Sequence, residues 1–280
     1  MFFKKKRSKL TVRHSILYKE AMRILLVRHG RSEGNVDESL YDTKGDCNIA
    51  LTDEGWGQAR DAGKFLGTLY KESKKNEWPR LYVSSYLRTQ QTLRGLLVGI
   101  GDAIPGKPKI LEDPRLVEKN FGAIASLIKL SKKGDLSAQF AKMLLNLSQD
   151  HWKKNPFVAK SLFGDSAKDT HLAVKQFIDG TLSRAIENKG HDDFVIVTHG
   201  AVIKPFLMSW AHMPMSQERA MKTPGNCDVI CIEGEPGNWK IRTIYDGENQ
   251  EAVNYDPFEN VEQLTIDTLP PAPDWLKQEL

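Results

Sequence analysis

Short apolar runs alternate along the chain with longer stretches in which apolar residues recur at helical spacing. Residues 24–27 and 194–198 are almost entirely apolar, as in strands buried on both faces of a parallel sheet. Residues 53–72 follow Thr52, a suitable N-cap, and repeat apolar positions every three or four residues, which predicts an amphipathic helix. The other predicted elements are strands at 81–83 and 109–111 and helices at 86–98, 171–189 and 201–210. This alternation indicates an α/β fold, a three-layer αβα sandwich with a mostly parallel central sheet.

Other segments depart from the alternation. Residues 227–233 and 239–245 predict two strands joined by the Gly/Pro-rich turn GEPGN, which would form an antiparallel edge of the sheet. Residues 123–165 have a helical, lysine-rich pattern, and we expect them to form a helical cap insertion beside an active site. The cap interrupts a domain at 22–254. A basic N-terminal tail at 1–21 precedes this domain, and a Pro-rich C-terminal tail at 255–280, on the surface or disordered, follows it.

Composition and charge exclude several classes of protein. Apolar residues make up 40% and charged residues 27% of the chain, as in soluble globular proteins, and no apolar run approaches the ~20 residues of a transmembrane helix. The net charge of +4 is too small to indicate nucleic-acid binding. Part of it lies in residues 4–7, which we interpret as a solvated tail rather than a contact with lipid or a partner. The start lacks the apolar region of a secretory signal, so we expect a cytoplasmic protein.

The cysteines indicate neither a metal site nor a disulfide framework. The three cysteines, Cys47, Cys227 and Cys231, are odd in number and are not spaced as in zinc sites. We therefore expect no structural metal, and a reducing compartment fits this composition.

Two of the predicted strands end in the same way. Arg28, His29 and Gly30 follow the first apolar run, and His199 and Gly200 follow the second. The carboxyl ends of parallel strands meet at one edge of a sheet, where ligands bind, so we expect the two histidines to converge on one crevice near a positive helix end. A single His-Gly after a strand is usually only a turn, but the pair favours a functional site.

Two charged residues are placed near the same edge. Arg88 lies in the first turn of the helix after the strand at 81–83, and its guanidinium can bind a phosphate through two parallel hydrogen bonds. Glu118 follows the strand at 109–111. Taken singly, each residue is more simply explained as a surface charge.

Together these residues resemble a known family. The motifs RHGRSEGN, SSYLRTQQT, PRLVEKNFG and VTHG are similar, in order and local spacing, to those of the histidine phosphatase superfamily, also called phosphoglycerate-mutase-like, over residues 23–235. Tyr86, Arg88 and Thr89, together with VTHGAVIKPFLMSW and the later PGNC, resemble the plant and fungal phosphoglycerate-mutase-like phosphatases most closely.

The resemblance implies a metal-independent phosphatase without a cofactor, which acts on a small phosphorylated metabolite or another phosphoester. His29 would be the nucleophile that forms a phosphohistidine, and a backbone carbonyl such as that of Gly30 would fix its tautomer. Glu118 would be the general acid and then the general base. Two arginines, a protonated His199 and helix-end amides would stabilise the transferring phosphoryl group. The implied phosphate-binding residues are Arg28, Ser32, Asn35, Arg88, His199 and Gly200.

Two alternatives stay open. Cofactor-dependent phosphoglycerate mutases resemble this pattern, but they carry Arg directly after the catalytic Glu and Tyr-Gly two residues further on. Here residues 119–122 are Lys-Asn-Phe-Gly, which favours the phosphatase. A non-catalytic scaffold would be expected to lose a member of the His-Arg-Glu-His set, and this chain keeps all of them. The physiological substrate and the oligomeric state are not predicted.

Two local departures bear on the structure. Many relatives carry Gly-Glu-Ser before the long helix, whereas this chain has Asp165 in the middle position, so a substrate contact by that carboxylate is in doubt. Pro205 lies inside the helix expected after His199, which predicts that the helix starts late or is kinked.

Overall fold

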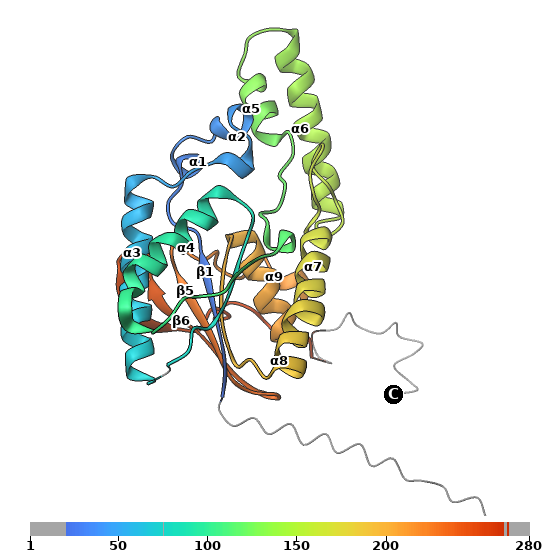
Figure 1. Ribbon diagram of the computed structural model, residues 1–280. Coiled ribbons are helices and arrows are strands. Elements are labelled where there is room, and N and C mark those ends of the chain that lie inside the picture. The colour runs from blue at the N-terminus through green and yellow to red at the C-terminus, as the bar shows by residue number, and fades with distance from the viewer. Residues whose placement is uncertain (1–20, 75, 266–267, 269–280) are drawn as a thin grey trace, which may run out of the picture.

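The computed structural model of the protein describes residues 21–74, 76–265 and 268. Its centre is a seven-stranded sheet with the order β3-β2-β4-β1-β5-β6-β7, in which β3, β2, β4 and β1 are parallel and the other three strands are antiparallel (Figure 1). The strands are β1 (Met22–Arg28), β2 (Arg80–Val83), β3 (Ile110–Glu112), β4 (Asp193–Thr198), β5 (Val229–Glu235), β6 (Asn238–Asp246) and β7 (Glu251–Tyr255). The mostly parallel sheet with an antiparallel edge is confirmed.

Helices cover both faces of this sheet. The pair α3 and α4 packs on one face, and α7, α8 and α9 pack on the other (Figure 1). The α-helices are α1 (Glu33–Val36), α2 (Leu40–Thr43), α3 (Asp53–Glu72), α4 (Leu87–Ile100), α5 (Ile124–Ser131), α6 (Leu136–Lys154), α7 (Ala167–Gln176), α8 (Ser183–Lys189) and α9 (Gly200–Trp210). Shorter turns are η1 (Asp46–Asn48), η2 (Gly101–Ala103), η3 (Pro114–Leu116), the π-helical η4 (Phe177–Leu182) and η5 (Met215–Gln217). None of the helices in this described part combines the length and hydropathy needed to traverse a bilayer.

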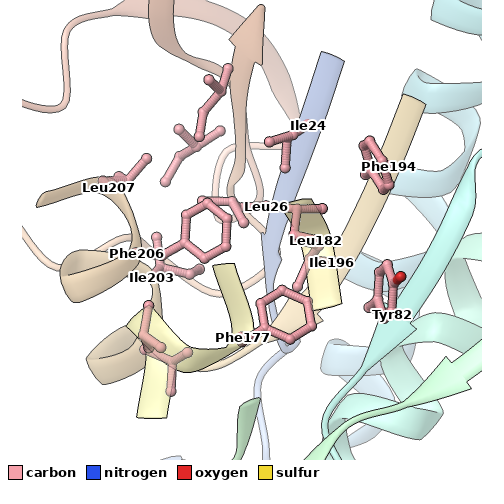
Figure 2. Close-up of a cluster of buried hydrophobic side chains, with 14 of the residues drawn as sticks. Ile24, Leu26, Tyr82, Phe177, Leu182, Phe194, Ile196, Ile203, Phe206 and Leu207 are labelled. Carbon is pink, nitrogen blue, oxygen red and sulfur yellow. The ribbon is translucent and has the colours of Figure 1, made fainter. Parts of the chain in front are cut away.

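The central residues of β1, 24–27, are all apolar because both faces of the strand are buried. Ile24 and Leu26 point to one face and join the cluster that contains Phe177, between the sheet and α7–α9 (Figure 2). Leu25 and Val27 point to the other face and pack with α3 and α4. Successive side chains of a strand alternate between faces, and both faces are covered here, so all four central residues, 24–27, are apolar.

The pairing of β1 with β4 determines the position of the site. The two strands are parallel, and their last residues, Arg28 and Thr198, lie opposite one another, so His29 and His199 leave adjacent strand ends. At the opposite end of this pair, Arg23 Nη2 lies 2.6 Å from Asp193 Oδ2 in a buried ion pair. This contact between partner residues holds the register, because a slip of one residue would separate the two charges.

The cap predicted from the lysine-rich segment is present as α5 and α6. These helices pair with each other and project beyond the carboxyl ends of the parallel strands (Figure 1). Ser126 of α5 donates a hydrogen bond to Asp42 Oδ1 of α2 at 2.6 Å, which joins the cap to the segment after β1.

Several predicted boundaries were wrong. The helix expected at 171–189 begins at Ala167, because Ser166 caps it: Ser166 Oγ accepts from the N–H of Asp169, whose side chain accepts from the N–H of Ser166. The π-helical η4 then interrupts it before α8. A late start of the helix after His199 was also wrong, since α9 begins at Gly200 and continues through Pro205.

The predicted tails fall mostly outside the described residues. Residues 1–20 and 269–280 are not described, so the predictions for them stay untested. Within the described part, β7 was missed. It ends at Tyr255, pairs with β6 and therefore extends the sheet to the predicted boundary at 254–255.

Helices α3 and α4 approach each other through glycines. A Cβ atom at Gly63 of α3 would lie 2.3 Å from the main-chain oxygen of Leu96 in α4. A Cβ atom at Gly57, in the same helix, would meet nothing within 4 Å. A substitution at Gly63 therefore tests the close packing of α3 against α4, whereas the same substitution at Gly57 tests only the general cost of glycine in a helix.

We expect Gly63→Ala to lower the free energy of unfolding by about 1–3 kcal/mol, because backbone atoms of α4 must move away from the added methyl group. Gly57→Ala is the matched control and should raise the free energy of unfolding by up to about 1 kcal/mol, the usual preference of a helix for alanine. Urea unfolding followed by circular dichroism measures both. Equal effects of the two substitutions would contradict the close packing.

Candidate active site

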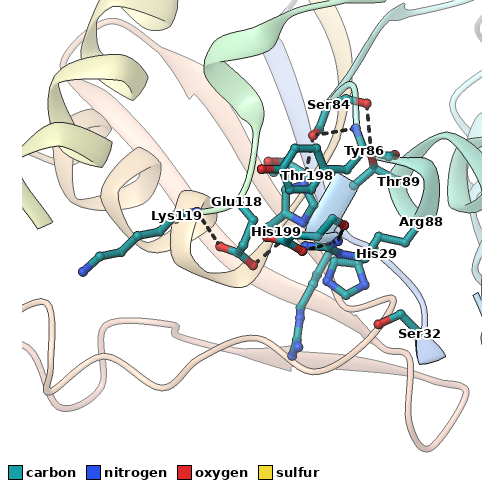
Figure 3. A network of polar contacts seen from close by, with 12 residues as sticks. His29, Ser32, Ser84, Tyr86, Arg88, Thr89, Glu118, Lys119, Thr198 and His199 are labelled. Atoms are coloured by element: carbon teal, nitrogen blue, oxygen red, sulfur yellow. Dashed lines mark hydrogen bonds and ion pairs between the residues drawn. The ribbon is translucent and has the colours of Figure 1, made fainter. Parts of the chain in front are cut away.

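The two histidines from the strand ends meet in one buried site. The ring centroids of His29 and His199 lie 5.2 Å apart at an interplanar angle of 60° (Figure 3). Their exposed fractions are 2% and 0%. Arg88, 1% exposed, enters from the first turn of α4, and Glu118 comes from the loop after η3. The expected convergence of the four motifs is therefore observed.

His29 is held in one orientation by its own neighbour. Its Nδ1 lies 2.8 Å from the main-chain oxygen of Gly30. A carbonyl oxygen only accepts hydrogen bonds, so Nδ1 carries the proton and a neutral ring keeps its lone pair on Nε2. Burial, and then the charges of Arg88 and Arg28, hold the pKa of His29 well below its ordinary value. The imidazole is therefore neutral and suited to nucleophilic attack.

His199 is fixed from the other side of the site. Ser84 Oγ lies 2.9 Å from His199 Nε2, and the ring of Tyr86 packs edge-on against the imidazole. Burial, and then the neighbouring His29 and arginines, lower the pKa of His199 well below its ordinary value. Protonation of His199 while a phosphoryl group is bound stays a prediction, because a phosphate dianion would raise this pKa again. A neutral ring can still donate from Nδ1 to a ligand when Ser84 donates to Nε2.

The two arginines are fixed by main-chain oxygens. Arg28 Nη1 donates to the oxygen of Pro224 at 2.6 Å. Arg88 Nη1 donates to the main-chain oxygen of Asp46 at 2.7 Å and lies 2.7 Å from the carboxylate of the same residue. These contacts orient each guanidinium without using all of its donors.

Three buried nitrogens of the site lack a hydrogen bond. Within the part of the chain that the structure describes, Arg28 Nε, Arg88 Nε and His199 Nδ1 are inaccessible to solvent and make no hydrogen bond. Leaving a buried donor unpaired costs about 1–3 kcal/mol, so such groups usually serve a ligand. Three donors, two of them on cations, suit an anion with several oxygens, such as a phosphoryl group.

Glu118 is the acidic member of the site. Its Oε2 lies 3.8 Å from His199 Nδ1, and its Oε1 accepts a hydrogen bond from the N–H of Lys119 (Figure 3). Burial raises the pKa of Glu118 to about 7, although the charge of Arg88 opposes this. At neutral pH the carboxyl is thus divided between its two protonation states, as a group that must both give and take a proton requires.

Three further predicted phosphate ligands lie around this centre. Ser32 is fully buried, and its hydroxyl donates to Asn35 Oδ1 at 3.1 Å. Asn226 Nδ2 donates to the main-chain oxygen of His29 and lies 3.3 Å from Asn35 Oδ1. Asn35 Oδ1 is thus engaged within the protein, so a phosphate would bind to the amide nitrogen. Phosphate contacts by Ser32 and Asn35 stay predictions.

Gly200 begins α9 directly after His199, where the first N–H groups of a helix lack intrahelical partners. A Cβ atom here would lie 2.9 Å from Thr223 Cγ2 and 3.5 Å from Arg28 Nε. Glycine therefore allows Thr223 to pack closely against the start of the helix, whereas the distance to Arg28 would be an ordinary van der Waals contact.

Sequence reasoning assigned no role at the site to four residues that position it, although two of them lie within the motif SSYLRTQQT. Ser84 directly follows β2, and Tyr86, whose ring lies 5.0 Å from the Arg88 guanidinium carbon, is the N-cap of α4. Their places after a strand could have identified them by the rule that identified the histidines. Asp46 and Asn226 lie in irregular segments and had no comparable signal.

The same groups could also be considered as metal ligands. One ligand atom from each of His29, Glu118 and His199 lies within 4.8 Å of the others. However, Arg28 and Arg88 place two positive charges beside these atoms and repel a divalent cation. The electrostatics of the site therefore favour an anion.

Comparison with known proteins identifies the family of this chain. The family model of the histidine phosphatase superfamily (branch 1) matches residues 24–247. Among curated proteins, the phosphoglycerate mutase-like protein AT74 of Arabidopsis thaliana is 31% identical over 78% of this chain and 67% of its own length. The broad-range acid phosphatase DET1 of Saccharomyces cerevisiae is 23% identical over 79% of this chain and 88% of its own.

A solved structure shares the fold. The alpha-ribazole phosphatase from Shigella flexneri superposes with a TM-score of 0.57 at 20% identity, and the match covers 79% of this chain and 95% of that one. The family model covers most of the chain and includes all four motifs that meet at the site. The chain therefore belongs to the histidine phosphatase superfamily.

Proposed function

We propose that the protein hydrolyses phosphate monoesters through a phosphohistidine on His29 and does so without a metal ion. The observation that carries this proposal is the orientation of His29. Its Nδ1 is bound to the Gly30 oxygen, so Nε2 keeps a lone pair. The ring lies 5.2 Å from that of His199, and it is close enough to Arg88 and Arg28 for their charges to add to the effect of burial in lowering its pKa. A neutral nucleophile next to an anion-binding site is what phosphoryl transfer to histidine requires.

In the first step, His29 Nε2 attacks phosphorus, and the bond from phosphorus to the leaving oxygen breaks. The guanidinium groups of Arg28 and Arg88 and the N–H of His199 bind the phosphoryl oxygens as negative charge collects on them. Glu118, with its pKa raised to about 7, gives its proton to the leaving oxygen. The alcohol departs, and His29 retains the phosphoryl group.

In the second step, the Glu118 carboxylate takes a proton from a water molecule as that water attacks phosphorus. The bond to His29 Nε2 breaks, inorganic phosphate forms, and Glu118 regains its proton. One residue therefore acts as acid and then as base, and the hydrogen bond from Nδ1 to Gly30 keeps the imidazole in place throughout.

We expect His29→Ala to reduce the hydrolysis of p-nitrophenyl phosphate by about 1,000-fold or more and to abolish acid-labile phosphoenzyme, because the nucleophile is lost. His151→Ala, at an exposed histidine of α6, is the control and should retain both. A phosphoenzyme that survives in His29→Ala would contradict the proposal.

Treatment of the wild-type protein with EDTA should leave the rate of p-nitrophenyl phosphate hydrolysis unchanged, because arginines neutralise the charge that a metal ion would otherwise neutralise. The rate is measured before and after exhaustive dialysis against the chelator. Loss of activity that returns with added Zn²⁺ or Mg²⁺ would refute the metal-free mechanism.

The acid role of Glu118 predicts a pH dependence. The kcat/KM for glycerol 2-phosphate, a poor leaving group, divided by that for p-nitrophenyl phosphate should fall by about tenfold per pH unit above about pH 7, because only the poor leaving group needs the proton. The ratio cancels ionisation of His29, and both phosphates are already mostly dianions above about pH 7. Glu118→Gln should lower the ratio and remove its pH dependence. An unchanged ratio would exclude Glu118 as the acid.

The mutase alternative is tested directly. With 3-phosphoglycerate and 2,3-bisphosphoglycerate, we expect any release of inorganic phosphate to exceed isomerisation, because Lys119, Asn120 and Phe121 replace the residues that mutases carry after the acid. Chromatographic separation of the two phosphoglycerates measures isomerisation. Faster isomerisation than hydrolysis would favour the mutase.

A further inference from the structure

A cavity of about 480 Å³ opens beside Glu118, between α2, the loop after Glu118 and cap helix α5. Glu118 itself forms part of its wall. In the mechanism above, Glu118 protonates the leaving oxygen, so the rest of the leaving group must lie next to this carboxyl. The cavity is therefore the space that the alcohol portion of a substrate would enter.

The cavity wall carries negative charge. Glu38, Asp42 and Asp46 line it together with Glu118, and no lysine or arginine is among its described lining residues. Arg88 compensates Asp46 at 2.7 Å. Glu38 and Asp42 are exposed to solvent, and the hydrogen bond from Ser126 of the cap holds the Asp42 carboxylate at the cavity.

Three lysines of this region are not part of the cavity wall. Lys44 is 2.7 Å from the carboxylate of Glu33, Lys119 lies 5.8 Å from the ring centre of Phe121, and Lys129 of α5 interacts electrostatically with Asp37. None of them is among the described lining residues. A second anionic group inside the cavity would therefore meet the carboxylates of Glu38 and Asp42, whereas a cationic group would be attracted by them.

The rest of the wall is apolar. Tyr41 of α2, Phe121 of the loop, and Ile124 and Ile128 of α5 line the cavity. Phe121 and Ile128 are 55% and 43% exposed, which is high for large apolar side chains that the fold could have buried. A ligand with an apolar body would cover these two side chains while its charged end faced Asp42.

We propose that the preferred substrates are phosphate monoesters of alcohols or phenols that combine an apolar body with a positively charged nitrogen. The phosphoryl group binds between His29 and the arginines, the body lies against Phe121 and Ile128, and the ammonium group lies near Asp42 and Glu38. This inference rests on the proposed phosphatase activity. It assigns Asp42 and Phe121 as specificity-determining residues.

Three matched aryl phosphates test the inference: 4-(2-aminoethyl)phenyl, 4-ethylphenyl and 4-(2-carboxyethyl)phenyl phosphate. Their leaving phenols have similar acidity, so differences in kcat/KM report binding of the side group. We expect kcat/KM to decrease in the order given and to be at least about tenfold higher for the amine than for the carboxylate. This amine-to-carboxylate ratio should become smaller as the salt concentration is raised.

Asp42→Asn should lower the amine-to-carboxylate ratio by about threefold or more, since one carboxylate is removed. Asp150→Asn makes the same charge change on an exposed site of cap helix α6 away from the cavity, and should leave the ratio unchanged. Phe121→Ala should raise KM for all three esters with a smaller effect on kcat, because it removes binding surface rather than charge.

The possible outcomes separate the two claims. Hydrolysis of all three esters with equal kcat/KM, or preference for the carboxylate, would overturn the inference while leaving the phosphatase in place. An equal change in the ratio for Asp42→Asn and Asp150→Asn would also overturn it, since the selectivity would then come from overall charge. Hydrolysis of p-nitrophenyl phosphate but of none of the three esters would overturn the inference alone, whereas hydrolysis of none of the four would overturn the proposed function and the inference with it.

Discussion

The parallel pairing of β1 with β4 is the constraint on which the site depends. Register places Arg28 opposite Thr198, so the next residue of each strand is a histidine at the same edge of the sheet. The Arg23–Asp193 ion pair fixes that register from the far end of the strands. A shift of one residue would turn Ile24 and Leu26 toward the wrong layer and would also separate His29 from His199. The hydrophobic core and the catalytic geometry are therefore enforced by the same strand pairing.

Burial then sets the pKa values of the ionisable side chains in the site. It is the largest cause of the lowered pKa of both histidines and of the raised pKa of Glu118. Each shift favours the neutral form, so the two arginines are the main fixed charges beside the histidines, together with the Asp46 carboxylate that pairs with Arg88. With Glu118 only partly ionised at neutral pH, two cations outweigh the carboxylates, and a phosphate dianion can offset the excess. Because Asp46 already pairs with Arg88, a bound phosphate must compete with or share that guanidinium.

The sequence predicts those strands and helices whose apolar residues follow a regular period. The runs at 24–27 and 194–198 and the helix at 53–72 are close to the observed β1, β4 and α3, because burial on both faces or on one stripe leaves a strong pattern. The histidines and Arg88 could be placed because they directly follow such elements. The start of α7 was missed because its cap box lies outside the apolar pattern, and β7 was missed because an edge strand with one exposed face needs few apolar residues. Asp46 and Asn226 reach the site through loops, whose paths depend on tertiary contacts.

The same contrast between regular elements and loops distinguishes the reaction centre from the cavity that would select the substrate. The proposed nucleophile and the proposed phosphoryl-binding groups come from strand ends and helix starts, which the sheet holds rigidly. The cavity beside Glu118 is built instead from α2, the loop at 119–122 and α5, none of which belongs to the sheet. The hydrogen bond from Ser126 to Asp42 joins two of these pieces, so the position of the cap and the position of the cavity's charge depend on each other. Substitutions in the cap can therefore change which alcohol is accepted without disturbing the register of β1 and β4, whereas a change at that register would remove the reaction itself.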